Sequence, residues 1–188
     1  MKVQPYKIGS LTPDNHWVEH RYPDAWDLQR TTGPDRLVLA PAERQIDLIL
    51  DLLRPLPAPF GVLHVLVASR CGNTTARRQA PTPMQLRDVA EFLREFEEFF
   101  ERDGRHHVWV TSLSSQSTIV YDNHNIVYAY GPLEQLVGRA ETRGLARRAI
   151  EIPVPHDHRF NLEYDDAEAA LLDRFDWLEF PLQPGDDP

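Results

Sequence analysis

The chain has 188 residues, with 20 basic and 29 acidic side chains, and its formal net charge is −9 at pH 7. Hydrophobic residues make up 41% and charged residues 26%, a composition that is typical of folded proteins and excludes wholesale disorder. A chain of this length needs no disulfide or metal to stay folded. We expect one globular domain over 1–188, with an irregular N-terminal segment (1–35) and a frayed acidic tail (181–188).

The cysteine count and the charge exclude several kinds of site and partner. Cys71 is the only cysteine, which excludes an intramolecular disulfide and a cysteine-based zinc site and favours a reducing compartment. No stretch approaches the roughly 20 apolar residues of a membrane helix, and the N-terminus has no signal-peptide pattern. Because an anionic surface repels nucleic acid and anionic lipid, we expect a cytoplasmic protein without either partner.

The first half of the chain predicts strands separated by one helix. Residues 16–22 and, more clearly, 36–39 have strand patterns. A helix begins near Pro41, carries apolar residues at helical spacing, and is ended by closely spaced prolines. Residues 60–68 are almost continuously apolar, which is typical of a central strand covered on both faces. A polar, arginine-bearing loop is expected over 69–81.

The second half begins with the clearest helix, which starts after Thr82 and Pro83 and ends before Gly104. Its apolar stripe consists of Val89, Phe92, Leu93, Phe96, Phe99 and Phe100. A three-strand meander then covers 106–130, with a hairpin at Asp122–Asn125. A helix from Pro132, a strand at 149–152 and a final helix capped by Asp165 or Asp166 complete the pattern.

This order of elements predicts an α+β fold, in which a mainly antiparallel sheet of about five strands packs against three to four helices. The meander 106–130 belongs to that sheet and lies in the C-terminal half of the chain. The unit from Phe60 to Thr111 is a right-handed β-α-β crossover if its two strands are parallel.

Histidines and aromatic residues within the strands are expected to serve mainly the core. His64 fits a hydrogen-bonded core histidine, and His106 and His107 should face opposite sides of their strand. Trp109, Tyr121, Tyr128 and Tyr130 could line a binding face, although aromatic residues at strand spacing are usually core residues.

Cys71 and Arg77 have the C-x5-R spacing, and the segment between them resembles the phosphate loop of cysteine-dependent phosphatases. That resemblance implies a thiolate nucleophile at Cys71 and a phosphate-binding guanidinium at Arg77. Prolines delay the helix that follows such a loop, and Arg78 stands where the family has Ser or Thr. The alternative is an exposed loop with a free thiol.

His156 and His158 are the second candidate site. In an extended segment, residues two apart face the same way, so both imidazoles could bind one metal ion. A third ligand could come from Asp165, Asp166 or His124. A metal-dependent hydrolase is therefore one possible function, and a simple polar loop is the other interpretation.

The interpretation that the sequence favours is a non-catalytic binding module without a cofactor, directed at a basic protein. The end of the chain from residue 163 holds nine acids against Arg174 alone. In size and charge the whole protein resembles immunity proteins that neutralise a toxin, an analogy of general character only. The expected binding residues are Asp165, Asp166, Glu168, Asp173, Asp176 and Trp177. The pattern leaves the oligomeric state open.

Overall fold

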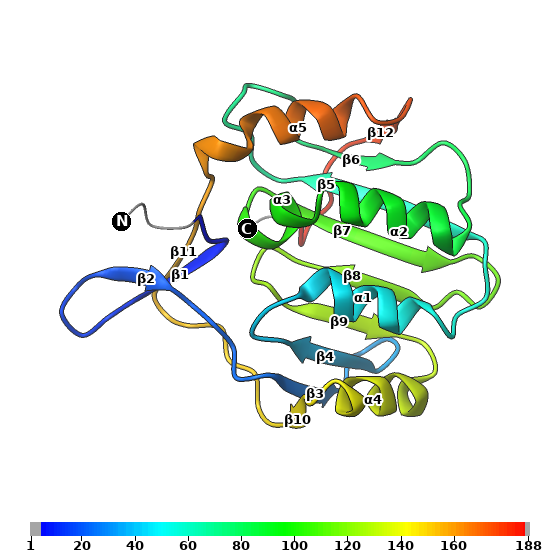
Figure 1. Ribbon diagram of the computed structural model, residues 1–188, viewed down its shortest axis with the longest axis horizontal. Helices are drawn as coiled ribbons and strands as arrows, with labels where there is room; N and C mark the ends of the chain where they lie inside the picture. Colours follow the sequence, from blue (N-terminus) through cyan, green and yellow to red (C-terminus); the bar gives the residue numbers. More distant parts are fainter. Residues whose placement is uncertain (1–4, 187–188) are drawn as a thin grey trace.

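The computed structural model describes residues 5–186, which form a nine-stranded sheet, a three-stranded sheet and five α-helices (Figure 1). The large sheet has the order β10-β3-β4-β9-β8-β7-β5-β6-β12, and every neighbouring pair is antiparallel except β10 and β3. Its strands are β3 (Ala25–Gln29), β4 (Arg36–Ala40), β5 (Phe60–Leu66), β6 (Ala76–Gln79), β7 (His106–Ser112), β8 (Thr118–Tyr121), β9 (Val127–Tyr130), β10 (Ala146–Arg147) and β12 (Leu178–Phe180).

The small sheet lies beside the large one and brings a segment near the N-terminus next to residues 156–158. Its central strand β1 (Ile8–Leu11) pairs antiparallel with β2 (Trp17–Glu19) and with β11 (His156–His158). Ile8 lies opposite His158, so the register of this pairing fixes where the two histidines of β11 stand.

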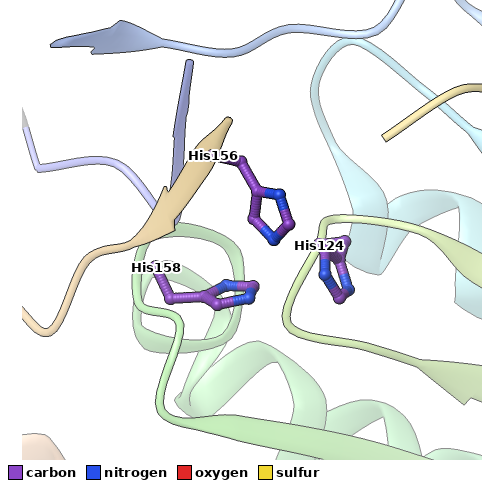
Figure 2. Close-up of side chains that lie close together, drawn as sticks. All are labelled: His124, His156 and His158. Atoms are coloured by element: carbon purple, nitrogen blue, oxygen red, sulfur yellow. The ribbon is translucent and has the colours of Figure 1, made fainter. Parts of the chain in front are cut away.

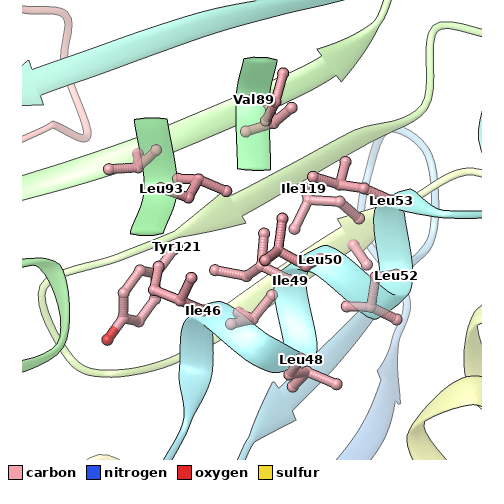
Figure 3. Close-up of a cluster of buried hydrophobic side chains, with 14 of the residues drawn as sticks. Ile46, Leu48, Ile49, Leu50, Leu52, Leu53, Val89, Leu93, Ile119 and Tyr121 are labelled. Carbon is pink, nitrogen blue, oxygen red and sulfur yellow. The ribbon is translucent and has the colours of Figure 1, made fainter. Parts of the chain in front are cut away.

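The helices cover one face of the large sheet (Figure 1). They are α1 (Gln45–Leu53), α2 (Leu86–Glu95), α3 (Glu97–Arg102), α4 (Leu133–Thr142) and α5 (Asp165–Leu172), with a 3₁₀ turn at Leu162–Tyr164 before α5. Strand alternation sends Val108, Val110 and Ile119 toward them. Figure 3 shows Ile46 of α1 beside Tyr121 and Leu53 beside Ile119, both of β8. Each such buried side chain stabilises the fold by roughly 1.5–3 kcal/mol.

The opposite face of the sheet is much less covered in the part of the chain that the structure describes. A small apolar cluster of Tyr22, Val38, Ala40 and Ile126 lies on it, with Ile150 and Ile152 packed against the cluster. The rest of this face, from β4 across β9 and β8 to β7, carries polar and aromatic side chains that line a pocket.

The structure confirms the α+β class and the meander 106–130 with its hairpin, and it corrects the extent of the sheet. The sheet is larger than the five strands expected, it is mixed, and a second sheet accompanies it. The additional strands β6, β11 and β12 are short and rich in charged residues or histidine, so alternation of apolar residues did not reveal them. The proposed β-α-β crossover is wrong, because β5 and β7 pair antiparallel.

The local predictions differ from the structure at three further places. The strand expected at 149–152 is absent, and the two-residue β10 precedes it. Residues 5–35, expected to be irregular, contain β1, β2 and β3. Within the tail expected to be frayed, Asp186 is buried and accepts hydrogen bonds from Arg77, whereas residues 187–188 lie outside the described residues.

Candidate metal centre and adjoining pocket

Three histidines from two distant segments converge beside the end of the meander (Figure 2). His124 lies in the β8–β9 hairpin, and His156 and His158 project from the same side of β11. One ring nitrogen from each residue lies within 4.8 Å of those of the other two. A tetrahedral zinc ion with bonds of about 2.0–2.1 Å holds its ligands roughly 3.3 Å apart, so the imidazoles surround a space that fits a single ion.

Each of these imidazoles is held through its Nδ1 atom by an oxygen acceptor. Nδ1 of His156 bonds the Pro153 carbonyl oxygen at 2.9 Å, and Nδ1 of His158 bonds the Asn123 carbonyl oxygen at 3.2 Å. Nδ1 of His124 bonds Oδ2 of Asp122 at 3.1 Å. A carbonyl oxygen or carboxylate can only accept, so Nδ1 carries a proton, and in the tautomer that this selects Nε2 holds the lone pair. Metal-binding histidines are oriented in this way.

The hairpin is built to keep His124 in place. Oδ1 of Asp122 accepts the backbone N–H groups of His124 and Ile126, both at 2.9 Å, while its Oδ2 holds the imidazole. Asn125 takes the left-handed conformation that closes the turn. These bonds, and that from Nδ1 of His124, hold the pKa of Asp122 below its usual range despite burial, so the residue is a carboxylate at neutral pH.

His158 is the most enclosed of the three ligands. Its Nε2 atom is buried and has no hydrogen-bond partner among residues 5–186. Burial, followed by the proximity of His124 and His156, lowers the pKa of His158 to about 4. A neutral, buried imidazole with a free lone pair is the form that binds a metal ion.

A pocket of about 530 Å³ adjoins the three-histidine cluster on the uncovered face of the large sheet. His124 belongs to both, because it is a member of the cluster and also lines the pocket. The other lining residues are Pro34, Arg36, His107, Trp109, Gln116, Thr118, Val120, Asp122, Asn123, Tyr128, Tyr130 and Gly185. The volume suits a small molecule.

Polar atoms without partners line this pocket. Nε2 of His107, Nδ2 of Asn123 and Nε1 of Trp109 are buried and make no hydrogen bond within the described residues. His107 is 8% exposed and Asn123 only 1%, so neither side chain is a loose surface group. Leaving such groups unpaired costs roughly 1–3 kcal/mol each, and a bound ligand could supply the missing partners.

The structure places Cys71 and Arg77 in roles unlike those of a phosphate loop. Arg77 belongs to β6, and its Nε and Nη2 atoms each donate a 2.7 Å hydrogen bond to the carboxylate of Asp186. Its guanidinium is therefore already occupied. The pKa of Cys71 is raised, first by loss of hydration and then by Glu168 and Asp165, which opposes thiolate formation. A catalytic role for this pair remains a sequence prediction.

The residues expected to bind a basic partner fall into two groups. Asp165 and Glu168 pair with Arg105, and Trp177 donates from Nε1 to the Leu171 carbonyl oxygen at 3.1 Å. Asp166, Asp173 and Asp176 are exposed. The acidity of α5 is thus partly neutralised inside the molecule, and partner binding by this set stays a prediction.

The structure brings His124, one of the three possible third ligands, to His156 and His158. Asp165 and Asp166 lie on α5, where Asp165 pairs with Arg70 and Arg105 instead. Sequence reasoning overlooked Arg36 and treated Trp109, Tyr128 and Tyr130 chiefly as core candidates. The alternation of side chains along β8 and β9 could have shown which face of the sheet Tyr128 and Tyr130 occupy. Ile119 and Val127 are buried on the core side, so the residues next to them lie on the other side.

No protein-family model, curated protein or solved structure matches this chain. None of the helices within residues 5–186 has the length and apolar character required to cross a bilayer.

Proposed function

We propose that the protein is a zinc-dependent hydrolase of small molecules, with His124, His156 and His158 as metal ligands. The observation that carries this proposal is the shared orientation of the three imidazoles, each held at Nδ1 by an oxygen acceptor with Nε2 free. Three nitrogen ligands suit zinc, and catalytic zinc sites use three protein ligands and keep a fourth position open.

The chain's own residues would position the ion and the substrate. Bound zinc supplies a Lewis acid that polarises a carbonyl oxygen and lowers the pKa of a bound water to about 7. Asp122 orients His124 and balances part of the positive charge of the ion. The adjoining pocket would hold the substrate against this centre, because His124 forms part of its wall.

Zinc binding to the purified protein tests the ligand set. Isothermal titration calorimetry should show one zinc per chain for the wild type and a loss of at least 100-fold in affinity for the double variant His156→Ala/His158→Ala. His16→Ala is the matched control, because His16 is exposed and lies outside the cluster. Unchanged zinc affinity in the double variant would refute the site.

Hydrolysis of an aryl acetate tests the activity. Water adds to the acyl carbon, the acyl C–O bond breaks, and acetate and a phenol are released. The zinc-loaded wild type should turn over the ester, and both the chelated protein and the double variant should lose at least 100-fold of that rate. Zinc binding without any metal-dependent hydrolysis would support the metal site and refute the hydrolase activity.

A second candidate function is the binding of a basic protein, and one observation favours it. A hollow of about 920 Å³ is bordered by two arginines, Arg94 and Arg102, and by six acids, which are Glu95, Glu97, Glu98, Glu101, Glu163 and Asp166. Such a surface attracts a cationic partner at low ionic strength. A cationic model protein such as cytochrome c should bind at 20 mM salt and dissociate at 300 mM, and Glu163→Gln/Asp166→Asn should weaken this binding.

A further inference from the structure

The pocket has two chemically different ends, and the sheet register fixes how far apart they lie. Asp122 follows β8 directly at the histidine end, and Thr118 begins β8 at the other end, where it lies opposite Tyr130. Four residues of an antiparallel strand span about 13 Å. A ligand that fills the pocket lengthwise therefore touches both His124 and the far end.

The far end carries the only Lys or Arg side chain in the pocket lining, which is Arg36 of β4. Its Nε donates to Oε1 of Gln29 at 2.7 Å and its Nη1 donates to the Tyr130 hydroxyl at 3.0 Å. Its guanidinium also lies 4.2 Å above the centre of the Tyr128 ring. Arg36 is thereby held in one position.

Nothing among the described residues neutralises this cation. Arg36 makes no ion pair with a carboxylate within residues 5–186, and its Nη2 atom makes no hydrogen bond there. A fixed, partly buried guanidinium with free N–H groups is suited to a carboxylate or another planar anion.

Between the two ends, the pocket is lined by Trp109, Val120 and Tyr128. The guanidinium of Arg36 lies over the Tyr128 ring, and that of Arg77 lies 5.2 Å from the centre of the Trp109 ring. Val120 lies opposite Trp109 on one neighbouring strand and opposite Tyr128 on the other, so these three side chains form one row across the sheet. Both aromatic residues belong to the pocket lining. A row of this kind accommodates the face of an aromatic or other planar body.

We propose that the pocket binds an elongated small molecule with a planar apolar body and an anionic end. The anion pairs with Arg36, the body lies along Trp109 and Val120 beside the Tyr128 ring that Arg36 covers, and the opposite end reaches His124. His107 and Asn123 line the pocket, and each has a buried polar atom without a hydrogen-bond partner among residues 5–186. The placement of the end at His124 rests on the proposed zinc hydrolase, whereas recognition of the anion does not.

Binding of 4′-hydroxybiphenyl-4-carboxylate tests the anion recognition, with the corresponding carboxamide as its neutral match. Calorimetry on the metal-free protein should show the carboxylate binding at least 10-fold more tightly than the amide. Arg36→Gln should abolish this preference, and Arg36→Lys should retain part of it because the charge remains. Equal affinity for the acid and the amide in the wild type, or an unchanged preference in Arg36→Gln, would overturn the proposal.

The same proteins separate this proposal from the zinc hydrolase. Arg36→Gln should bind zinc as the wild type does and unfold at the same urea concentration, because Arg36 touches neither the histidines nor the main core. With 4′-acetoxybiphenyl-4-carboxylate as the substrate, the variant should show a KM that is at least 10-fold higher than that of the wild type. A preference for the carboxylate without zinc binding would refute only the zinc hydrolase proposal. Zinc-dependent hydrolysis without a preference for the carboxylate would refute only the proposed anion recognition in the pocket.

Discussion

Arg105 donates a 2.6 Å hydrogen bond from Nη1 to Oε2 of Glu168, and both side chains are fully buried. Arg105 also bonds Asp103 through Nε at 2.8 Å. Oε1 of Glu168 accepts from Nδ2 of Asn73 at 2.8 Å. This network ties α5 and the loop after β5 to the start of β7. Because its charges have no access to water, each depends on the others.

Glu168→Gln should therefore lower the free energy of unfolding by about 3 kcal/mol, since it leaves the buried guanidinium of Arg105 with less negative charge. Urea denaturation followed by tryptophan fluorescence measures this change. Asp166→Asn is the control on the same helix, and its exposed position predicts a change within about 0.5 kcal/mol. Equal losses in the two variants would contradict a special role for the buried network.

Asp122→Asn should weaken zinc binding by about 10- to 100-fold while the hairpin still forms. The amide oxygen can continue to accept the N–H groups of His124 and Ile126. The amide NH₂ would then face Nδ1 of His124 and donate to it, which moves the ring proton to Nε2 and blocks the metal position. Calorimetric zinc titration checks this, and affinity equal to that of the wild type would show that His124 is not a ligand.

The protein should lose stability steeply as the pH falls below 6.5. Burial lowers the pKa of His64 from 6.5 to about 3 and that of His107 to about 4, and it holds the pKa of His106 well below 6.5. Between pH 6.5 and about 4 the unfolded chain thus binds more protons than the folded one, so stability falls with falling pH. These three groups alone contribute a slope of about 4 kcal/mol per pH unit, and His158, whose pKa burial also lowers to about 4, adds to it.

His106→Phe tests this linkage, because the His106 ring packs between aromatic neighbours, with centroids 4.3 Å from Phe99 and 5.2 Å from Phe100. Neither ring nitrogen of His106 has a partner within residues 5–186, so the substitution removes no hydrogen bond. Urea unfolding at pH 7, 6 and 5 should show the slope reduced by about 1.4 kcal/mol per pH unit. A slope equal to that of the wild type would contradict the neutral state of His106.

Lys7 should add stability at alkaline pH. Its Nζ atom is buried, donates to the Phe100 carbonyl oxygen at 2.9 Å and lies 3.7 Å above the Tyr121 ring. Burial lowers its pKa from 10.5 to about 7. Between these values the unfolded chain carries the extra proton, so the free energy of unfolding rises as the pH increases. Lys7→Met should remove this rise, which urea unfolding at pH 7 and 9 would reveal.

The sequence predicted the elements whose apolar pattern is strong. The stripe of α2 and the alternation of β7, β8 and β9 reflect direct contact with the core, so the elements within 86–130 were predicted apart from their exact ends. The single helix expected before Gly104 is divided at Phe96 into α2 and α3. The short strands β6, β11 and β12 owe their positions to pairing with distant segments, as in the contact of Phe180 with Arg77. Such pairing leaves no periodicity in the local sequence.

The sequence predicted only the part of the candidate site that depends on local geometry. The spacing of His156 and His158 indicates two ligands on one side of an extended segment, and their joint orientation requires only local geometry. The third ligand comes from a hairpin more than thirty residues earlier, as the bond from His158 to Asn123 shows. The choice among His124, Asp165 and Asp166 therefore depended on the packing of the small sheet, which the linear pattern does not encode.

The short β12 covers the edge of β6 at one side of the large sheet. Its three residues pair with β6, and the two-residue β10 closes the opposite edge (Figure 1). A long unpaired edge would offer its free amide and carbonyl groups to a second molecule. A chain cut before Leu178 would expose Arg77, Arg78 and Gln79 of β6 in this way. Residues 178–180 thus act as a cover over the backbone edge that β6 would otherwise present.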